Sequence, residues 1–499
     1  MGANDSSWPG PLALDDPGPI VALRQAFTGA GFDGDAVRRS LGAHDETVVR
    51  AGEAPLLRRR IEGLGALGTL IALFVLDLPV PVAEVEEALP GLTAARLEAL
   101  GLAATVGGLV RTDVRIVPHG ELVIVSDPGG RGVSQPDHVA GLHNASGMLD
   151  QLTVRRPIGT ALDVGTGSGI HAITARRHSD RVVATDINVR ALNFAAFNAI
   201  LNGTPDIELR RGSFFEPVAG ERFDLLVCNP PFVISPEAAF LFRDSGLEGD
   251  TVSRQLIEGT PALLEEGGYA TVLVSWSQPN DEPWSAPLRR WLEGSGCDAI
   301  LLLSSTQDPL AHASNWTRDR AAGDVDAFES ALARWLDYLE RHGIEGVSYG
   351  GVVLRRRRAG SNWIQEHVMP ASGLEAAGAH LLRMFEAQDY LAGLRGDEEL
   401  LHERLALTGT ARVAQHVSLR ENRWNVDAIR IRLDEGLGFD AEVDASTARF
   451  LAALDGNRTV AEVVDALAEG QPDREQVSRS ALPVVRGLLE LGYVERAPG

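Results

Sequence analysis

Asn229, Pro230 and Phe232 belong to the stretch "NPPF", which closes an apolar run in the middle of the chain. An amide or aromatic amine is a poor nucleophile because its lone pair is delocalised into the π-system. The Asn229 side-chain oxygen and the Pro230 carbonyl can each accept one N–H of such a nitrogen, and the prolines hold that carbonyl rigidly because they fix φ and lack a donor. Phe232 can stack on a planar amide or base. The pattern predicts a site that turns a planar nitrogen into a nucleophile, with a strand-ending turn as the simpler alternative.

A glycine-rich loop, "ALDVGTGSG" (161–169), precedes this motif. Gly165, Gly167 and Gly169 let the backbone approach a ligand, and the helix that follows presents unpaired N–H groups. About twenty residues further along the chain, "VVATD" ends in Asp186, which is placed to accept hydrogen bonds from ribose hydroxyls. These features predict a nucleotide-like cofactor, either a nicotinamide dinucleotide or S-adenosylmethionine.

Two observations favour S-adenosylmethionine. Asp163 lies just before the glycines, where a carboxylate can meet a cationic amino group, and the NPPF motif follows the fourth strand. The third strand ends in "RRGSFFEP", where Ser213 and Phe214 would flank an adenine. The predicted cofactor-binding residues are Asp163, Gly165, Thr166, Gly167, Gly169, Asp186, Ile187, Ser213, Phe214 and Asn229. Methyl transfer from a sulfonium, which leaves S-adenosylhomocysteine, depends on positioning, so we expect neither a general base nor a metal.

Alternating strands and helices must position these residues. Residues 138–358 contain seven apolar strand-like runs separated by helical stretches, which predicts an α/β domain with a Rossmann-like, doubly wound and mainly parallel sheet. The carboxyl end of the fourth strand faces the ligand crevice of such a sheet, so Asn229 is expected to reach into it. His138 and His143 precede the glycine loop and could border the pocket, although single histidines are more often structural.

The flanking regions predict two further domains. Residues 18–127 have helical periodicity followed by two β-rich runs, typical of a helical, winged-helix-like domain, and 1–17 are expected to be disordered or extended. Residues 360–499 predict an α+β domain that ends in a winged-helix-like module. The apolar run at 64–76 has 13 residues, which is too short to span a bilayer, and predicts a buried helix.

Composition bounds the partners. The formal net charge is -23, and all 46 basic residues are arginine, so the average surface repels phosphate backbones and argues mildly against a nucleic-acid partner. The run Arg355 to Arg358 could meet phosphates, or could serve as strand-end arginines that face acidic helices. Two cysteines provide no disulfide framework, which favours the cytoplasm. The acidic, Pro-rich start lacks the apolar region of a signal peptide, and we expect no membrane partner.

Together these motifs resemble those of the class I S-adenosylmethionine-dependent methyltransferases of the "methyltransferase small" group, which includes the HemK-type glutamine methyltransferases of release factors. "DVGTGSG" is similar to motif I of the group, "ATDIN" to motif II and "NPPF" to motif IV. The resemblance implies that Asp163, Gly165, Gly167 and Asp186 bind the cofactor and that Asn229, Pro230 and Phe232 hold the target nitrogen. The segment 243–257 is similar to a Gly-Asp segment of the HemK type, and 454–467 looks like winged-helix domains that clasp peptides.

Three functions stay open from the sequence. The favoured one is N-methylation of a planar nitrogen, such as a glutamine amide, in a protein or peptide. The alternative is methylation of an RNA base at guanine N2 or adenine N6, which would require a base splayed out of its stack. Less favoured are an O-methyltransferase that acts on a peptide or small molecule, and a regulator that senses S-adenosylmethionine.

Overall fold

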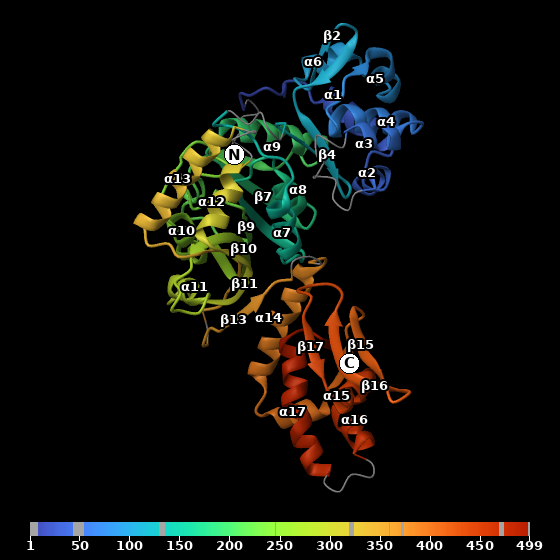
Figure 1. The fold of residues 1–499 in the computed structure, drawn as a ribbon, viewed down its shortest axis with the longest axis vertical. Coiled ribbons are helices and arrows are strands. Elements are labelled where there is room, and N and C mark those ends of the chain that lie inside the picture. Colours follow the sequence, from blue (N-terminus) through green and yellow to red (C-terminus); the bar gives the residue numbers. More distant parts are fainter. Residues whose placement is uncertain are drawn as a thin grey trace. The chain divides into compact units, whose positions relative to one another are not determined.

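The computed structural model describes residues 8–42, 54–128, 135–244, 246–318, 324–358, 360–370, 374–468 and 474–497. The chain divides into two units (Figure 1). The first consists of residues 1–150 and 156–367, and the second of residues 151–155 and 368–499. The N-terminal part therefore packs with the central domain in one unit.

An eight-stranded sheet forms the centre of the first unit, in the order β13-β11-β12-β10-β9-β6-β7-β8. Its strands are β6 (Ile158–Val164), β7 (Ser179–Asp186), β8 (Glu208–Arg211), β9 (Phe223–Cys228), β10 (Leu264–Ser277), β11 (Cys297–Gln307), β12 (Val347–Arg356) and β13 (Ile364–Val368). The strands from β8 to β10 are mutually parallel, whereas β12 runs antiparallel to both of its neighbours. The predicted Rossmann-like, mainly parallel sheet is thus confirmed.

Helices cover both faces of this sheet (Figure 1). On one face, α10 and α11 share an apolar core with alternate strand residues such as Leu162 and Val164. On the other face, Asp163 accepts a hydrogen bond from the backbone of α8. The helices of this domain are α7 (Asn144–Leu152), α8 (Ile170–Arg176), α9 (Val189–Leu201), α10 (Thr251–Gly259), α11 (Ala286–Trp291), α12 (Pro309–Thr317) and α13 (Val325–Arg341), with short turns η3 (Glu216–Val218) and η4 (Thr260–Leu263).

The N-terminal part of the first unit combines short helices with two small sheets. The helices are α1 (Gly18–Gly29), α2 (Gly34–Leu41), α3 (Ala54–Ile61), α4 (Gly65–Leu70), the π-helix η2 (Ile71–Val75), α5 (Val82–Ala88) and α6 (Ala94–Ala99). The strands are β1 (Val80–Pro81), β2 (Ala103–Val106), β3 (Leu109–Thr112), β4 (Arg115–His119) and β5 (Leu122–Ser126). Leu70, Ile71 and Phe74 are buried, so the apolar run at 64–76 is the buried helix that the sequence predicts.

Asparagines in α9 and directly after it attach the N-terminal part to the central domain. Asn193 accepts a hydrogen bond from the Leu12 N–H (3.1 Å) and donates to the Leu12 carbonyl (2.9 Å), so residues around Leu12 lie along α9. Asn202 makes the same pair of bonds with the backbone of Val123 in β5. An amide side chain can replace a neighbouring strand in this way, because it offers one donor and one acceptor to the strand edge.

The second unit combines helices with two three-stranded sheets, of order β18-β14-β19 and β15-β16-β17. Its helices are α14 (Ala377–Gly393), η6 (Asp397–His402), α15 (Ala445–Ala453), α16 (Val460–Leu467) and α17 (Arg474–Glu490), and its strands are β14 (Arg404–Leu407), β15 (Ala411–Arg420), β16 (Arg423–Leu433), β17 (Asp440–Val443), β18 (Asp455–Thr459) and β19 (Val494–Arg496). A mixed α and β composition was expected here, while the winged-helix likeness of both ends stays a prediction. In the described part of the chain, no helix combines the length and the apolar character needed to cross a membrane.

Candidate active site

A cavity of about 210 Å³ lies at the carboxyl ends of the central strands, where β6 passes through the glycine loop into α8. Gly165 (φ 71°) and Gly167 (φ 54°) line this cavity, and a Cβ added at either position would meet no atom within 4 Å. Both glycines therefore leave the space above the loop open. Both also have a backbone conformation that other residues rarely adopt. Gly169 does not line the cavity, because it packs against Ala195 of α9, where an added Cβ would lie 3.0 Å from the Ala195 Cα.

Asp163 lies beneath the loop and is fully buried. Its Oδ2 accepts hydrogen bonds from the Thr166 hydroxyl (2.6 Å) and the Ala172 N–H (3.1 Å). Its Oδ1 has no hydrogen-bond partner among the described residues. Burial raises the pKa of Asp163 to about 7, since the charged form loses its hydration. Asp163 does not line the cavity itself, so the predicted contact with a cationic amino group rests on this unused oxygen.

Asp186 lines the cavity and organises the backbone of two loops. Its carboxylate accepts from the Gly167 N–H (2.9 Å) and from the Asn188 N–H (2.8 Å), and burial raises its pKa. The Ile187 N–H also bonds this carboxylate, and a carboxylate has about four acceptor positions, so one remains for a ligand. Ile187 beside it is an exposed apolar residue that also lines the cavity. The predicted ribose contact of Asp186 is compatible with this arrangement and stays a prediction.

The remaining predicted cofactor residues surround the same cavity. Thr166, Ser213, Phe214 and Asn229 all line it. Phe214 has a φ of 43°, a strained value for an aromatic residue, which turns the chain after β8 toward the cavity. The structure therefore brings eight of the ten predicted residues to one cavity, the exceptions being Asp163 and Gly169.

Asn229 and Pro230 stand where this cavity meets a second one of about 900 Å³, and they line both. The Pro230 carbonyl accepts from the Phe232 N–H (2.8 Å) and keeps a second lone pair. Phe232 lines only the second cavity. The Phe232 carbonyl is in turn held by the Ser275 hydroxyl. The NPPF segment is thus a rigid partition between the two cavities, with its amide oxygen and its carbonyl at the junction.

The second cavity has an aromatic side and a side made by the N-terminal part. Trp316 of α12 and Tyr349 of β12 lie on the aromatic side. Val117 of β4 and Ile124 of β5 form part of the opposite wall. The sequence predicts a β-wing in this region but no contribution to the site, because pairing of β4 with β5 gives no sign of where the hairpin packs.

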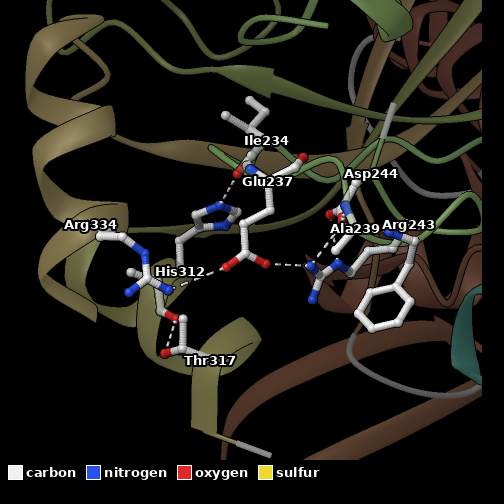
Figure 2. Close-up of polar contacts among 11 residues, drawn as sticks. Ile234, Glu237, Ala239, Arg243, Asp244, His312, Thr317 and Arg334 are labelled. Atoms are coloured by element: carbon white, nitrogen blue, oxygen red, sulfur yellow. Dashed lines mark hydrogen bonds and ion pairs between the residues drawn. The ribbon is translucent and has the colours of Figure 1, made fainter. Parts of the chain in front are cut away.

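A cluster around the buried Arg243, which lines the second cavity, joins this arginine to Glu237 and Asp244 (Figure 2). Arg243 binds the carboxylate of Asp244 through Nε (2.7 Å) and Nη2 (2.9 Å), and donates to Glu237 (2.9 Å). Glu237 also approaches Arg334, at 3.8 Å. Asp244 accepts from the N–H groups of Ala239 and Phe240, so the cluster fixes the loop after the NPPF motif. The two carboxylates compensate the charge of Arg243.

His138 and His143 also line both cavities. His138 is buried and its ring contacts Phe242 in a tilted arrangement, at 5.4 Å between ring centroids. Burial lowers the pKa of His138, against the opposing effect of Asp127. A neutral imidazole suits the surroundings of a cationic ligand. The expectation that these histidines border the pocket matches their placement, and their role stays a prediction.

Two sets of residues behave differently from the sequence interpretation. Arg355 and Arg357 pair with the buried Asp298 of β11 at 2.7 Å and 2.9 Å, so these arginines join the end of β12 to the start of β11, and their acidic partner is on a strand, not on a helix. His312, Trp316 and Tyr349 are absent from the sequence prediction although they stand at the second cavity or directly behind it. They come from α12 and β12, far from the motifs, and no local pattern marks them.

Comparison with known proteins assigns the central part of the chain. Residues 140–283 match the family model "Methyltransferase small domain". Residues 29–113 and 382–496 match models described as "Domain of unknown function (DUF7059)" and "Domain of unknown function (DUF7782)". The middle of the chain therefore matches a family whose description names an activity, whereas both flanks match families described as being of unknown function.

Curated relatives match the same central part. A release factor glutamine methyltransferase from Xylella fastidiosa is 34% identical over 167 residues, which cover 30% of this chain and 56% of the relative. A ribosomal protein uL3 glutamine methyltransferase from Bradyrhizobium diazoefficiens is 31% identical over 173 residues, 31% of this chain and 52% of the relative. The chain thus spans about half the length of these relatives. A solved ribosomal protein L11 methylase from Lactobacillus delbrueckii subsp. bulgaricus aligns over 43% of this chain and 77% of that protein, with 20% identity and a TM-score of 0.25.

The glycine loop, the NPPF partition and the order of the sheet all lie in or beside the matched range. Residues 140–283 match the methyltransferase small domain family, and they lie within a Rossmann-like α/β sheet.

Proposed function

We propose that this protein is an S-adenosylmethionine-dependent N-methyltransferase whose acceptor is the side-chain amide of a glutamine in a protein or peptide. The observation that carries the proposal is the position of Asn229 and Pro230, which line both cavities at their junction. A methyl group that passes from one cavity to the other must cross beside these two acceptors. The names of the curated relatives, which are glutamine methyltransferases, support the same reading.

The first cavity fits S-adenosylmethionine. Gly165 and Gly167 leave open space above the loop, and Asp186 keeps a free acceptor position beside it. The unused Oδ1 of Asp163 suits a cationic amino group, because a buried acceptor without a donor is costly. When bound, S-adenosylmethionine supplies an electrophilic methyl group, and S-adenosylhomocysteine remains as the product.

The chain's own residues prepare the acceptor nitrogen. The Asn229 Oδ1 and the Pro230 carbonyl accept its two N–H groups, which shifts electron density back to the nitrogen and orients its lone pair toward the first cavity. Phe232 offers a ring face to the planar amide. Two carbonyl groups of the segment are held by hydrogen bonds: that of Pro230 by the Phe232 N–H and that of Phe232 by the Ser275 hydroxyl. The segment therefore requires little reorganisation when the acceptor binds. The methylated nitrogen is strongly acidic, so its proton leaves to water without a dedicated base.

A protein acceptor agrees with the surroundings of the second cavity. The net charge of -23 and the compensated Arg243 cluster provide no broad basic surface for a phosphate backbone. Cys228 and Cys297 are free, buried thiols, which supports a reducing compartment such as the cytoplasm.

Labelled methyl transfer from S-adenosylmethionine into a cell lysate tests the proposal. The labelled lysate is divided into an RNase-treated and a protease-treated half. Label that survives RNase and is lost with protease is expected. Label that is lost with RNase would replace the protein acceptor by an RNA base.

A further inference from the structure

Tyr349 is a polar aromatic residue beside the proposed acceptor position. It lies on β12, lines the second cavity, and meets the ring of Phe232 edge-on, at 6.4 Å between centroids and 67° between planes. Phe232 is the ring that would face the acceptor amide. The hydroxyl of Tyr349 is therefore placed to take part in recognition of the acceptor, provided that its hydrogen and its lone pairs have defined directions.

His312 defines the direction of the hydroxyl hydrogen. This histidine is fully buried behind Tyr349, and its Nε2 lies 2.7 Å from the Ile234 carbonyl (Figure 2). A carbonyl only accepts, so Nε2 carries the imidazole hydrogen. Burial lowers the pKa of His312 to about 4, so the ring is neutral near pH 7 and its Nδ1 is a bare acceptor. The Tyr349 hydroxyl, 2.5 Å from Nδ1, must then donate to His312.

Trp316 occupies one of the two lone pairs of the hydroxyl oxygen. Its indole N–H can only donate, and it lies 3.1 Å from that oxygen. The hydroxyl has thus used its single hydrogen away from the cavity and retains one acceptor position. Since Tyr349 and Trp316 both line the second cavity, this acceptor position is the part of the hydroxyl that remains for a ligand.

We propose that Tyr349 is a specificity-determining residue that accepts a hydrogen bond from an N–H group of the methyl acceptor, with His312 as the positioning residue that prevents the hydroxyl from donating. The inference rests on the proposed N-methyl transfer and deepens it. A hydroxyl that can only accept hydrogen bonds favours a methyl acceptor that is rich in N–H groups, such as a primary amide with its neighbouring backbone N–H. The same hydroxyl offers nothing to a carboxylate at that position, because a carboxylate has no hydrogen to donate, and this disfavours carboxylate acceptors.

The first test compares Tyr349→Phe with Tyr338→Phe. Tyr338 also uses its hydroxyl in one hydrogen bond, from the Gly249 N–H at 2.9 Å, but it does not line either cavity, so it is a matched control. The acceptor is the lysate fraction that the wild type labels, titrated at saturating S-adenosylmethionine. Loss of one neutral hydrogen bond in Tyr349→Phe should raise the KM for that fraction about tenfold. The affinity for S-adenosylmethionine and the kcat should stay near those of the wild type, and Tyr338→Phe should leave the KM unchanged.

An unchanged KM in a folded Tyr349→Phe protein would overturn the inference. His312→Gln serves as a conservative variant, since a glutamine amide can donate to the Ile234 carbonyl and accept from Tyr349, whereas His312→Phe can do neither. Partial retention of the low KM in His312→Gln and its loss in His312→Phe is expected. Equal loss in both variants would reduce His312 to a packing role.

The tautomer of His312 provides a second measurement that needs no acceptor. Nitrogen NMR of the wild-type protein, with His312→Gln to assign the signal, should show a neutral ring protonated at Nε2. A ring protonated at Nδ1 would make the Tyr349 oxygen an acceptor toward His312, release its hydrogen to the cavity and overturn the inference. Failure of the proposed function can be distinguished from failure of this inference. In the first case the wild type would label RNA or nothing, whereas the His312 tautomer is measured without any methyl acceptor.

Discussion

Asn198 and Val125 exchange two hydrogen bonds: the Asn198 amide oxygen accepts from the Val125 N–H (2.9 Å), and its amide nitrogen donates to the Val125 carbonyl (2.8 Å). The second N–H of the same amide donates to the Ser168 carbonyl in the glycine loop (2.8 Å). One buried side chain on α9 therefore joins β5 to the glycine loop. β5 contributes to the wall of the second cavity, and the glycine loop lines the first cavity. The N-terminal part is in this way a structural component of the methyltransferase site.

Replacement of Asn198 by alanine should loosen both attachments. Three buried backbone groups would lose their partner, at a cost of about 3 kcal/mol in local opening free energy. Hydrogen exchange should rise in β5 and in the glycine loop. Asn425→Ala is the control, because Asn425 is exposed and its amide bonds only a nearby carbonyl. Exchange in β5 that is unchanged in Asn198→Ala would contradict the attachment.

Gly165→Ala and Gly169→Ala should separate ligand binding from folding. Both positions have a positive φ, so alanine costs about 1 kcal/mol of backbone strain at each. An alanine at 169 also meets the Ala195 backbone, so it should lower the thermal midpoint further, whereas an alanine at 165 fills open cavity space and should weaken S-adenosylmethionine binding by about tenfold or more. Calorimetry of binding and thermal unfolding measure the two effects. The cavity assignment would be contradicted if both variants lost the same stability and Gly165→Ala bound S-adenosylmethionine as tightly as the wild type.

The affinity for S-adenosylmethionine should depend on the charge of Asp163. Because burial raises its pKa to about 7, the carboxyl group is neutral at lower pH and becomes charged as the pH rises. A charged carboxylate pairs with a cationic amino group, so affinity should increase as the pH rises from about 6 to about 8. Asp163→Asn should bind about tenfold more weakly at the higher pH, without that increase. Asp224→Asn is the control, since Asp224 bonds Thr160 on the neighbouring strand and lines neither cavity. A pH dependence that persists in Asp163→Asn would assign it to another group.

The Asp186 carboxylate offers a separate test of the cofactor cavity. Asp186→Ala should weaken S-adenosylmethionine binding, both by loss of the predicted ribose contact and because the Gly167 N–H loses its acceptor. Asp206→Ala removes an exposed carboxylate that pairs with Arg176 and is the matched control. A dissociation constant in Asp186→Ala equal to that of the control would reject the assignment.

The sequence predicts the centre of the molecule well because local rules decide it. The seven strand-like runs become seven strands of the sheet, and continuous apolar residues mark the buried parallel strands at its centre, such as β6 and β9. The loop glycines and the NPPF motif lie at strand ends, and the carboxyl ends of parallel strands share one edge, which brings Gly165, Asp186 and Asn229 together.

Other parts depend on long-range packing that no local pattern encodes. Gly169 has the spacing of a ligand-binding glycine. A glycine is needed there for packing instead, because its φ is 87° and it contacts α9 closely. His312 and Tyr349 are 37 positions apart and meet only because β11 and β12 pair and α12 follows β11. The wall formed by β4 and β5 depends on asparagines of α9, whose side chains resemble ordinary helix residues in the sequence.

The most direct test of the account is Asn229→Ala, with methyl transfer and S-adenosylmethionine affinity measured on the same preparation. Asn229 lines both cavities, but the account gives it the acceptor nitrogen as its main partner. We predict that methyl transfer is abolished while the dissociation constant for S-adenosylmethionine stays close to that of the wild type. Transfer that persists in the variant, or a loss of S-adenosylmethionine binding that accounts for the lost activity, would contradict the role of Asn229 at the junction.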